Sequence, residues 1–258
     1  MYDEESDTSA LPKSWNLCDD LGQIEYIFSD KTGTLTSNMM DFKKASINGI
    51  QYGKWIEPAS YKGKTPTAMM HLEEERALMT NRWKEFVDCK YMDPKAGFID
   101  ASIPLQIREN GLQGKRIREF FSVLAICHTV LVEKTNDPNS NDIFYRAQSP
   151  DESALVNAAK NVGFVCLNRT DNKIDLDILG EKRTYTILNI MEFNSDRKRM
   201  GIIVQRPEGD IMLMCKGADS VIYERLNKDA SNHISQETSK HLQMFANNGI
   251  MLQVNLSQ

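Results

Sequence analysis

Residues 24–36 read IEYIFSDKTGTLT, and this stretch decides the expected fold. Its first five residues, 24–28, form a short apolar and aromatic run that predicts a buried β-strand. The run ends at the polar, glycine-containing segment 29–34, which predicts a loop. A carboxylate at the end of a strand, here Asp30, stands where open α/β sheets place their active sites. The stretch therefore predicts an α/β fold with Asp30 at its functional edge.

The loop carries the residue types that phosphoryl transfer requires. An aspartate such as Asp30 can act as a nucleophile toward phosphorus and form an aspartyl phosphate. Lys31 supplies a positive charge for the transferred group, and Thr32 and Thr34 supply hydroxyls. Gly33 lets the backbone approach the phosphate closely. The simpler alternative is a polar loop in which Asp30 only caps the local backbone, but the complete run after a predicted strand favours the catalytic interpretation.

The composition of the chain argues against several other classes of protein. Its 258 residues are 41% hydrophobic, which is ordinary for a globular protein and argues against disorder along the whole chain. A net charge of −5 without a dense basic block argues against nucleic-acid binding. The longest apolar stretch, residues 120–132, is shorter than the roughly 18 residues of a membrane span. The cysteines are widely spaced, which predicts reduced thiols, and the histidines show no metal-ligand spacing and are interpreted as ordinary core or surface residues.

Outside this stretch, the sequence predicts several helices and a group of short strands. The expected helices cover residues 71–88, 117–133, 150–162, 220–226 and 235–245. The expected strands cover residues 184–193, 200–205 and 211–215, with a hairpin turn at 206–210. Glycine and proline predict loops at 52–66 and 93–114, and residues 135–142 predict a turn. For the helix over 150–162, Ser149 is the expected N-cap, Pro150 the first helical residue and Glu152 the partner that closes a capping box.

Three blocks of sequence together resemble the P-type ATPases, and their details resemble the phospholipid-transporting subfamily, the P4-ATPases or flippases. The first block is the phosphorylation signature at 30–36, with its flanks at 15–29 and 41–44. The second is AQSPDESAL at 147–155. The third combines FNSDRKRM at 193–200 with CKGAD at 215–219, in which Asp219 stands where ion pumps usually have Pro-Glu. The matches cover about residues 1–246 in family order, whereas residues 54–114 carry no recognisable family motif.

This resemblance implies a fold and a division into domains. Residues 1–42 would begin a haloacid-dehalogenase-like α/β phosphorylation domain that carries the signature. Residues 43–258 would form an inserted α+β nucleotide-binding domain, with an antiparallel sheet flanked by helices and a truncated or divergent C-terminal end. Such an insertion would explain why the character of the sequence changes near residue 43.

The resemblance also implies the residues that act on Mg-ATP. Asp30 would attack the γ-phosphate of ATP with Lys31 beside it, and Asp30 and Thr32 would help to hold Mg²⁺. Soluble relatives of the phosphorylation domain usually carry a second aspartate where this chain has Thr32. The phosphoaspartate is therefore expected to be longer-lived, as a pump cycle requires.

The nucleotide pocket is implied residue by residue. Glu152 matches a glutamate at the adenine end, Phe193 an aromatic ring that stacks on adenine, and Ser195 and Lys198 the contacts that follow. Lys216 matches the lysine of the Lys-Gly-Ala signature. The residues themselves leave alternatives open, since Glu152 could serve only the capping box, Phe193 could be a core side chain at a strand end, and Lys198 could be a solvated charge.

Several parts that a flippase needs have no counterpart in the sequence. These are the transmembrane helices, the actuator domain and the second half of the phosphorylation domain. Met251 stands where the family has an arginine expected to contact ATP, and the last residues fit no family pattern. The chain therefore resembles a central cytosolic fragment, itself soluble, whose parent would lie in a Golgi, endosomal or plasma membrane. Phospholipid and an accessory subunit would be the partners of that parent.

Three hypotheses of function follow. In the first, the chain is the catalytic fragment of a flippase that couples ATP hydrolysis to phospholipid transfer between leaflets. In the second, it is a stand-alone ATP-binding or regulatory module without turnover. The third is a soluble phosphatase of the same superfamily, against which Thr32 and the inserted domain argue. The transported lipid cannot be deduced, because its specificity would lie in membrane helices.

Overall fold

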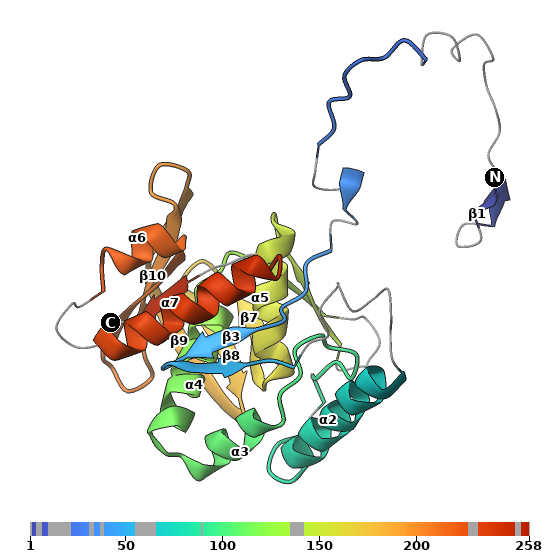
Figure 1. Cartoon of the computed structure of the whole chain (residues 1–258). Helices are drawn as coiled ribbons and strands as arrows, with labels where there is room; N and C mark the ends of the chain where they lie inside the picture. The colour runs from blue at the N-terminus through green and yellow to red at the C-terminus, as the bar shows by residue number, and fades with distance from the viewer. Residues whose placement is uncertain are drawn as a thin grey trace. The chain divides into compact units, whose positions relative to one another are not determined.

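The computed structural model describes residues 2–3, 7–9, 22–30, 34–36, 39–54, 66–88, 90–134, 142–226, 232–250 and 254–257. The chain divides into two compact units, Met1–Met39 and Met40–Gln258 (Figure 1). The division falls close to residue 42, where the sequence changes character.

The first unit holds little regular structure in its described residues. Strands β1 (Tyr2–Asp3) and β2 (Thr8–Ser9) form a short antiparallel pair. Residues 24–30 form neither helix nor strand, and all of them are exposed. The Phe28 side chain is 96% exposed. The buried strand predicted for residues 24–28 is therefore wrong for this chain, because an apolar strand is stable only where other elements cover its faces.

The second unit is built on a six-stranded antiparallel sheet. The strands lie in the order β12-β11-β10-β9-β8-β7, so that each strand pairs with its neighbour along this part of the chain. Their bounds are β7 (Phe164–Arg169), β8 (Lys173–Ile178), β9 (Glu181–Asn194), β10 (Arg199–Gln205), β11 (Ile211–Gly217) and β12 (Val254–Ser257). The predicted strands and the hairpin turn at 206–210 are confirmed. In that turn Gly209 adopts φ +97°, and Arg206 pairs with Asp210.

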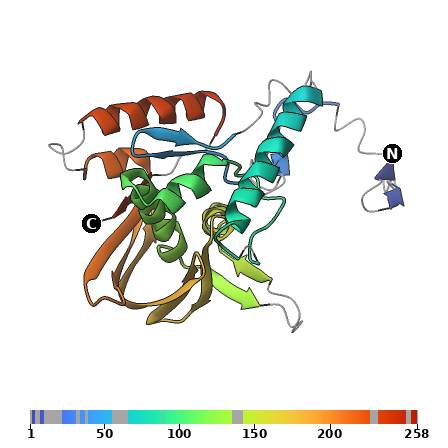
Figure 2. The ribbon, with the colours of Figure 1, turned by 90° about the horizontal axis from the view of Figure 1, so that it is seen from below.

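Helices α4 (Leu112–Ile126) and α5 (Pro150–Asn161) pack against this sheet (Figure 2). The buried face of α4 carries Phe121 and Leu124, and the Phe121 ring lies 6.1 Å from the Phe164 ring of β7. On the sheet, alternate residues face this core, as Ile202 and Val204 do on β10. The antiparallel sheet flanked by helices that the resemblance implied is confirmed.

The remaining elements surround this core. Two small antiparallel hairpins join β3 (Ala45–Ile47) to β4 (Ile50–Tyr52) and β5 (Leu131–Lys134) to β6 (Ile143–Arg146). The other helices are α2 (Pro66–Lys84), α3 (Ser102–Glu109), α6 (Asp219–Tyr223) and α7 (Asn232–Asn247). Helix α7 lies beside the β3–β4 hairpin in both views, and Ser46 Oγ is 2.9 Å from His241 Nδ1 (Figures 1 and 2).

Two local predictions differ from the structure, and a third concerns residues that are mostly not described. The helix predicted to reach residue 133 ends at Ile126, and Leu131–Lys134 instead forms β5. The predicted loop at 93–114 contains α3, because proline is tolerated in a first helical turn, where Pro104 lies. The turn predicted at 135–142 falls almost entirely outside the described residues. Among the described helices, none has both the length and the apolar character of a membrane span.

Candidate functional site

The N-terminus of α5 places Glu152 at the centre of the candidate site. Ser149 caps the helix by accepting a hydrogen bond from the Asp151 N–H at 3.2 Å, and Pro150 occupies the first turn, both as predicted. The capping box is wrong, however. The Glu152 carboxylate bonds to Thr129 and Lys216 instead of returning to the cap. The interpretation of Glu152 as only a capping residue therefore fails.

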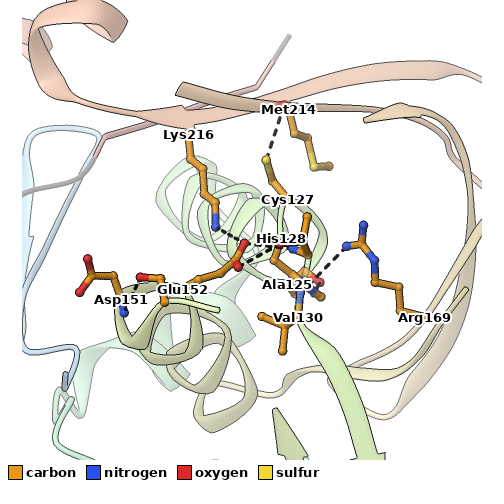
Figure 3. Close-up of polar contacts among 11 residues, drawn as sticks. Ala125, Cys127, His128, Val130, Asp151, Glu152, Arg169, Met214 and Lys216 are labelled. Atoms are coloured by element: carbon orange, nitrogen blue, oxygen red, sulfur yellow. Dashed lines mark hydrogen bonds and ion pairs between the residues drawn. The ribbon is translucent and has the colours of Figure 1, made fainter. Parts of the chain in front are cut away.

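Three donors hold the Glu152 carboxylate (Figure 3). The backbone N–H of Thr129 donates to Oε1 at 3.0 Å, and the Thr129 hydroxyl donates to Oε2 at 3.1 Å. The Lys216 ammonium lies 3.4 Å from Oε1. The side chains of Glu152 and Lys216 are only 14% and 6% exposed. This ion pair is thus largely removed from water, and each charge depends on its partner.

Strand β11 directs Lys216 toward the core face of the sheet. Lys216 pairs in register with Met200 of β10, and both residues are buried. The next residue, Gly217, permits a close approach of the chain. A Cβ atom at Gly217 would lie 2.6 Å from the carbonyl oxygen of Lys198, so a side chain there would displace the β9–β10 turn. The fold therefore requires a residue without a side chain at this position of the Lys-Gly-Ala segment.

A buried histidine lies behind the Glu152–Lys216 pair. His128 Nε2 is 3.0 Å from the Ala125 carbonyl, to which it donates, and Nδ1 accepts the Val130 N–H at 3.2 Å. The Arg169 guanidinium approaches the same Nδ1 at 3.5 Å. Burial, together with the positive charges of Arg169 and Lys216, lowers the pKa of His128 to about 3. The imidazole is therefore neutral at pH 7, and Nδ1 acts as an acceptor.

Cys127 and Arg169 also lie near the Glu152–Lys216 ion pair, and burial shifts the pKa of each. Burial raises the pKa of the Cys127 thiol to about 12, so this cysteine is a thiol and not a reactive thiolate. Burial also lowers the pKa of Arg169. The predicted reduced thiols are confirmed for the three cysteines in the described part of the chain, Cys127, Cys166 and Cys215.

The end of β9 and the turn that follows it hold three further predicted residues. Phe193 lies near the end of β9 with its side chain 64% exposed, so the interpretation of Phe193 as a core residue is wrong. Ser195 and Lys198 are exposed in the turn itself. The Lys198 N–H donates to the Asn194 carbonyl at 2.7 Å, and Lys198 adopts the left-handed φ of +48°. Its carbonyl accepts the Ala218 N–H at 3.0 Å, which fixes the turn against the segment after Lys216.

The phosphorylation signature lies in the first unit. Asp30 is described and exposed, whereas Lys31 and Thr32 lie outside the described residues. No group of three or more potential metal-binding side chains occurs among the residues that the structure describes. The structure thus pairs Glu152 with Lys216 and links the Lys198 carbonyl to the Ala218 N–H, while its described residues form no metal site around Asp30.

Sequence reasoning missed Thr129, His128 and Arg169. His128 and Thr129 follow the most apolar helix, where nothing in the local pattern distinguishes a binding residue from a loop residue. Arg169 ends β7, a strand that the sequence analysis did not predict. Only the folded chain reveals that Thr129 bonds to Glu152 and that Arg169 approaches His128.

Comparison with known proteins identifies the family. A sequence profile of the P-type ATPase cytoplasmic domain N matches residues 116–254, which is more than half of the chain. The chain belongs to the P-type ATPase family. The matched range runs from within α4 to β12 and includes Thr129, Glu152, Phe193 and Lys216.

Curated relatives in this family bear out the resemblance to its phospholipid-transporting members. The chain is 43% identical over 265 residues to the phospholipid-transporting ATPase DNF1 of Chaetomium thermophilum, and the match covers 97% of this chain. It is 47% identical over 247 residues to the phospholipid-transporting ATPase IC of Homo sapiens and covers 96% of this chain. The chain spans only 17% and 18% of the length of these two P-type ATPases.

Proposed function

We propose that the second unit binds ATP, with the adenine end at Glu152 and Lys216. The observation that supports this most strongly is the Glu152–Lys216 ion pair, largely buried yet bonded to the exposed Thr129, within the range matched by the family profile. Burying two charges costs solvation free energy, and in some proteins such a pair is kept because it serves specificity. Here the exposed Thr129 lies beside the ion pair, where a polar ligand can approach.

The other proposed contacts have chemistry that suits a nucleotide. The Phe193 ring is a large apolar surface in water, and an aromatic face of this kind stacks on a base. Lys198 is an exposed cation beside the same turn, suited to the polyphosphate, and Ser195 offers a hydroxyl next to it. The link from Lys198 to Ala218 ties the turn to the Lys216 strand, so base and phosphate contacts would belong to one rigid hairpin.

We further propose that the chain is the cytosolic catalytic part of a phospholipid-translocating ATPase. In that protein Asp30 would accept the γ-phosphoryl group, with Lys31 beside it. This region would lie on the cytosolic side of a Golgi, endosomal or plasma membrane. Phospholipid would be moved by other parts of the parent, which an accessory subunit would accompany. Asp30 and Thr32 are the proposed contributors to Mg²⁺ binding, but the described residues do not form a complete metal site, so the ion would need further ligands.

Titration calorimetry of the whole chain with ATP tests the nucleotide site. We expect a dissociation constant in the high-micromolar to millimolar range, or about −4 to −6 kcal/mol. Phe193→Ala should weaken binding by about 1–3 kcal/mol, because the variant loses the stacking surface. Phe144→Ala is the matched control, since the Phe144 ring is similarly exposed, at 59%, but lies on β6 outside the proposed site.

Both variants should remain folded, because neither side chain belongs to the core. Equal ATP affinity in Phe193→Ala and Phe144→Ala would refute the assignment of the stacking residue. Absence of ATP binding in the unsubstituted chain would refute the nucleotide site itself.

The exposure of Asp30 favours a second candidate function, ATP binding without turnover by this chain alone. Phosphoryl transfer depends on positioning and on charge neutralisation, and the exposed segment around Asp30 provides neither in its described residues. Incubation with γ-labelled ATP should therefore leave no acid-stable, hydroxylamine-sensitive label on the chain. Labelling that disappears in Asp30→Asn would favour the catalytic function of the isolated chain.

A further inference from the structure

The loop between α4 and β5, residues 127–130, is fixed from within. The neutral His128 imidazole accepts the Val130 N–H and donates to the Ala125 carbonyl, so it bridges the end of the helix to the start of the strand. The Cys127 N–H also donates to the Val123 carbonyl at 2.8 Å. Thr129 lies between these anchors and is exposed. The loop therefore presents the Thr129 N–H and hydroxyl in a defined position.

The hydrogen bonds to Glu152 leave one part of its carboxylate available. Within the described part of the chain, Oε1 receives two donors, the Thr129 N–H and the Lys216 ammonium, whereas Oε2 receives the Thr129 hydroxyl alone. A carboxylate has about four acceptor positions, two on each oxygen. One acceptor position on Oε2 thus remains, beside the exposed Thr129.

From this geometry we infer that Thr129 is a positioning residue that orients Glu152 to recognise the 6-amino group of a purine. The inference rests on the proposed ATP site and assigns to a loop outside the family motifs a role in base selection. The three donors fix the plane of the carboxylate. The Thr129 hydroxyl, which donates to Oε2, fixes the position of that oxygen. Without the hydroxyl, the carboxylate can rotate about its terminal bond, and the free acceptor position is no longer fixed.

The chemistry of the purine edge gives this orientation a consequence. An ionised carboxylate can only accept hydrogen bonds. The 6-amino group of adenine donates to it, whereas the 6-oxo group of hypoxanthine presents another acceptor and repels it. ATP and inosine triphosphate share the same triphosphate and ribose, so their affinity ratio isolates recognition at this position.

The test measures the dissociation constants of ATP and inosine triphosphate with the whole chain by titration calorimetry. The unsubstituted chain should prefer ATP by about tenfold, as expected for a hydrogen bond to a charged group. Thr129→Val keeps the side-chain shape but removes the hydroxyl. It should weaken ATP binding by about fivefold and leave the affinity for inosine triphosphate nearly unchanged. The ratio of the two affinities should therefore fall. Thr129→Ser restores a hydroxyl and should restore the preference.

Thr184→Val is the matched control. The Thr184 hydroxyl also donates to a carboxylate, that of Asp175 at 2.7 Å, but both residues are on the β8–β9 pair away from Glu152. This variant should keep the ATP preference of the unsubstituted chain. Thermal unfolding of all variants verifies that each is folded.

The outcomes separate this inference from the proposed function. Equal affinity for the two nucleotides in the unsubstituted chain would leave the ATP site standing and overturn recognition of the amino group. An equal loss for both nucleotides in Thr129→Val, or no rescue by Thr129→Ser, would show a merely structural threonine and overturn the positioning role. Binding of neither nucleotide would instead reject the proposed function.

Discussion

Asp30 in the first unit and Glu152 in the second are both acidic residues of highly specific motifs, yet their surroundings are opposite. Asp30 is exposed, and within the described residues its carboxylate forms no hydrogen bond or ion pair. Glu152 is held by three donors, two from Thr129 in the loop between α4 and β5 and one from Lys216 on β11. A motif names the chemistry that a residue can perform, but a site requires neighbours that orient it. The second unit contains those neighbours for Glu152.

The largest expected difference between the two units concerns their aromatic side chains. Phe164→Ala removes a fully buried ring that packs against Phe121, and should cost about 3–5 kcal/mol of unfolding free energy. Phe28→Ala removes a ring that is almost completely exposed and should change stability by less than about 0.5 kcal/mol. Urea denaturation of both variants measures the contrast. A large loss in Phe28→Ala would show that the first unit buries this ring in solution.

The next prediction concerns the buried ion pair. Glu152→Gln keeps the shape of the side chain but leaves the buried Lys216 ammonium without its counter-charge, which should cost about 3 kcal/mol. Glu208→Gln is the control, because Glu208 forms an exposed ion pair with Arg183 at 2.8 Å and should cost at most about 1 kcal/mol. Similar losses in the two variants, measured by denaturation, would contradict the distinct environment assigned to Glu152.

The pH dependence of stability tests the loop behind the site. His128 has its pKa lowered in the folded state, so the unfolded chain binds a proton at a higher pH than the folded chain does. Its contribution to stability is complete above about pH 6.5 and is lost as pH falls toward about 3. Between pH 7 and pH 5 this amounts to about 2 kcal/mol. His128→Gln should flatten the fall, and an unchanged slope would exclude a buried, neutral His128.

The smallest effect is expected at the helix cap that supports Glu152. Ser149→Ala removes the hydrogen bond from the Asp151 N–H and should cost about 1 kcal/mol. Ser29→Ala provides the comparison in the first unit, since its hydroxyl donates only to the exposed Asp30 carbonyl at 3.1 Å. That variant should leave the denaturation midpoint unchanged. Equal shifts in the two midpoints would show that the cap contributes no more than an exposed local contact.

The elements predicted correctly have a strong local signal. Ser149 and Pro150 mark the start of α5, Gly163 with φ +85° follows its end, and Gly209 marks the hairpin between β10 and β11. The β3–β4 hairpin was missed, although Asn48 and Gly49 both adopt the positive φ of the turn that Asn-Gly favours. The strand predicted at residues 24–28 failed for the opposite reason, because its formation depends on partners that no local pattern reports.

By itself, the sequence determined the family, the order of the motifs and the residue types available for phosphate and base chemistry. These properties are local or depend on motif spacing, so they can be recognised without coordinates. Only the tertiary structure decided what Glu152 contacts. A capping box and a contact with a distant strand are equally compatible with the local sequence. Pairing of β10 with β11 carries Lys216 to the core face, and the end of α4 delivers Thr129, from positions 64 and 23 residues away in the chain. The Glu152–Lys216 pair can be buried because the fold brings the two opposite charges together. Their meeting depends on the packing of the helix and the sheet, and no local sequence pattern encodes it.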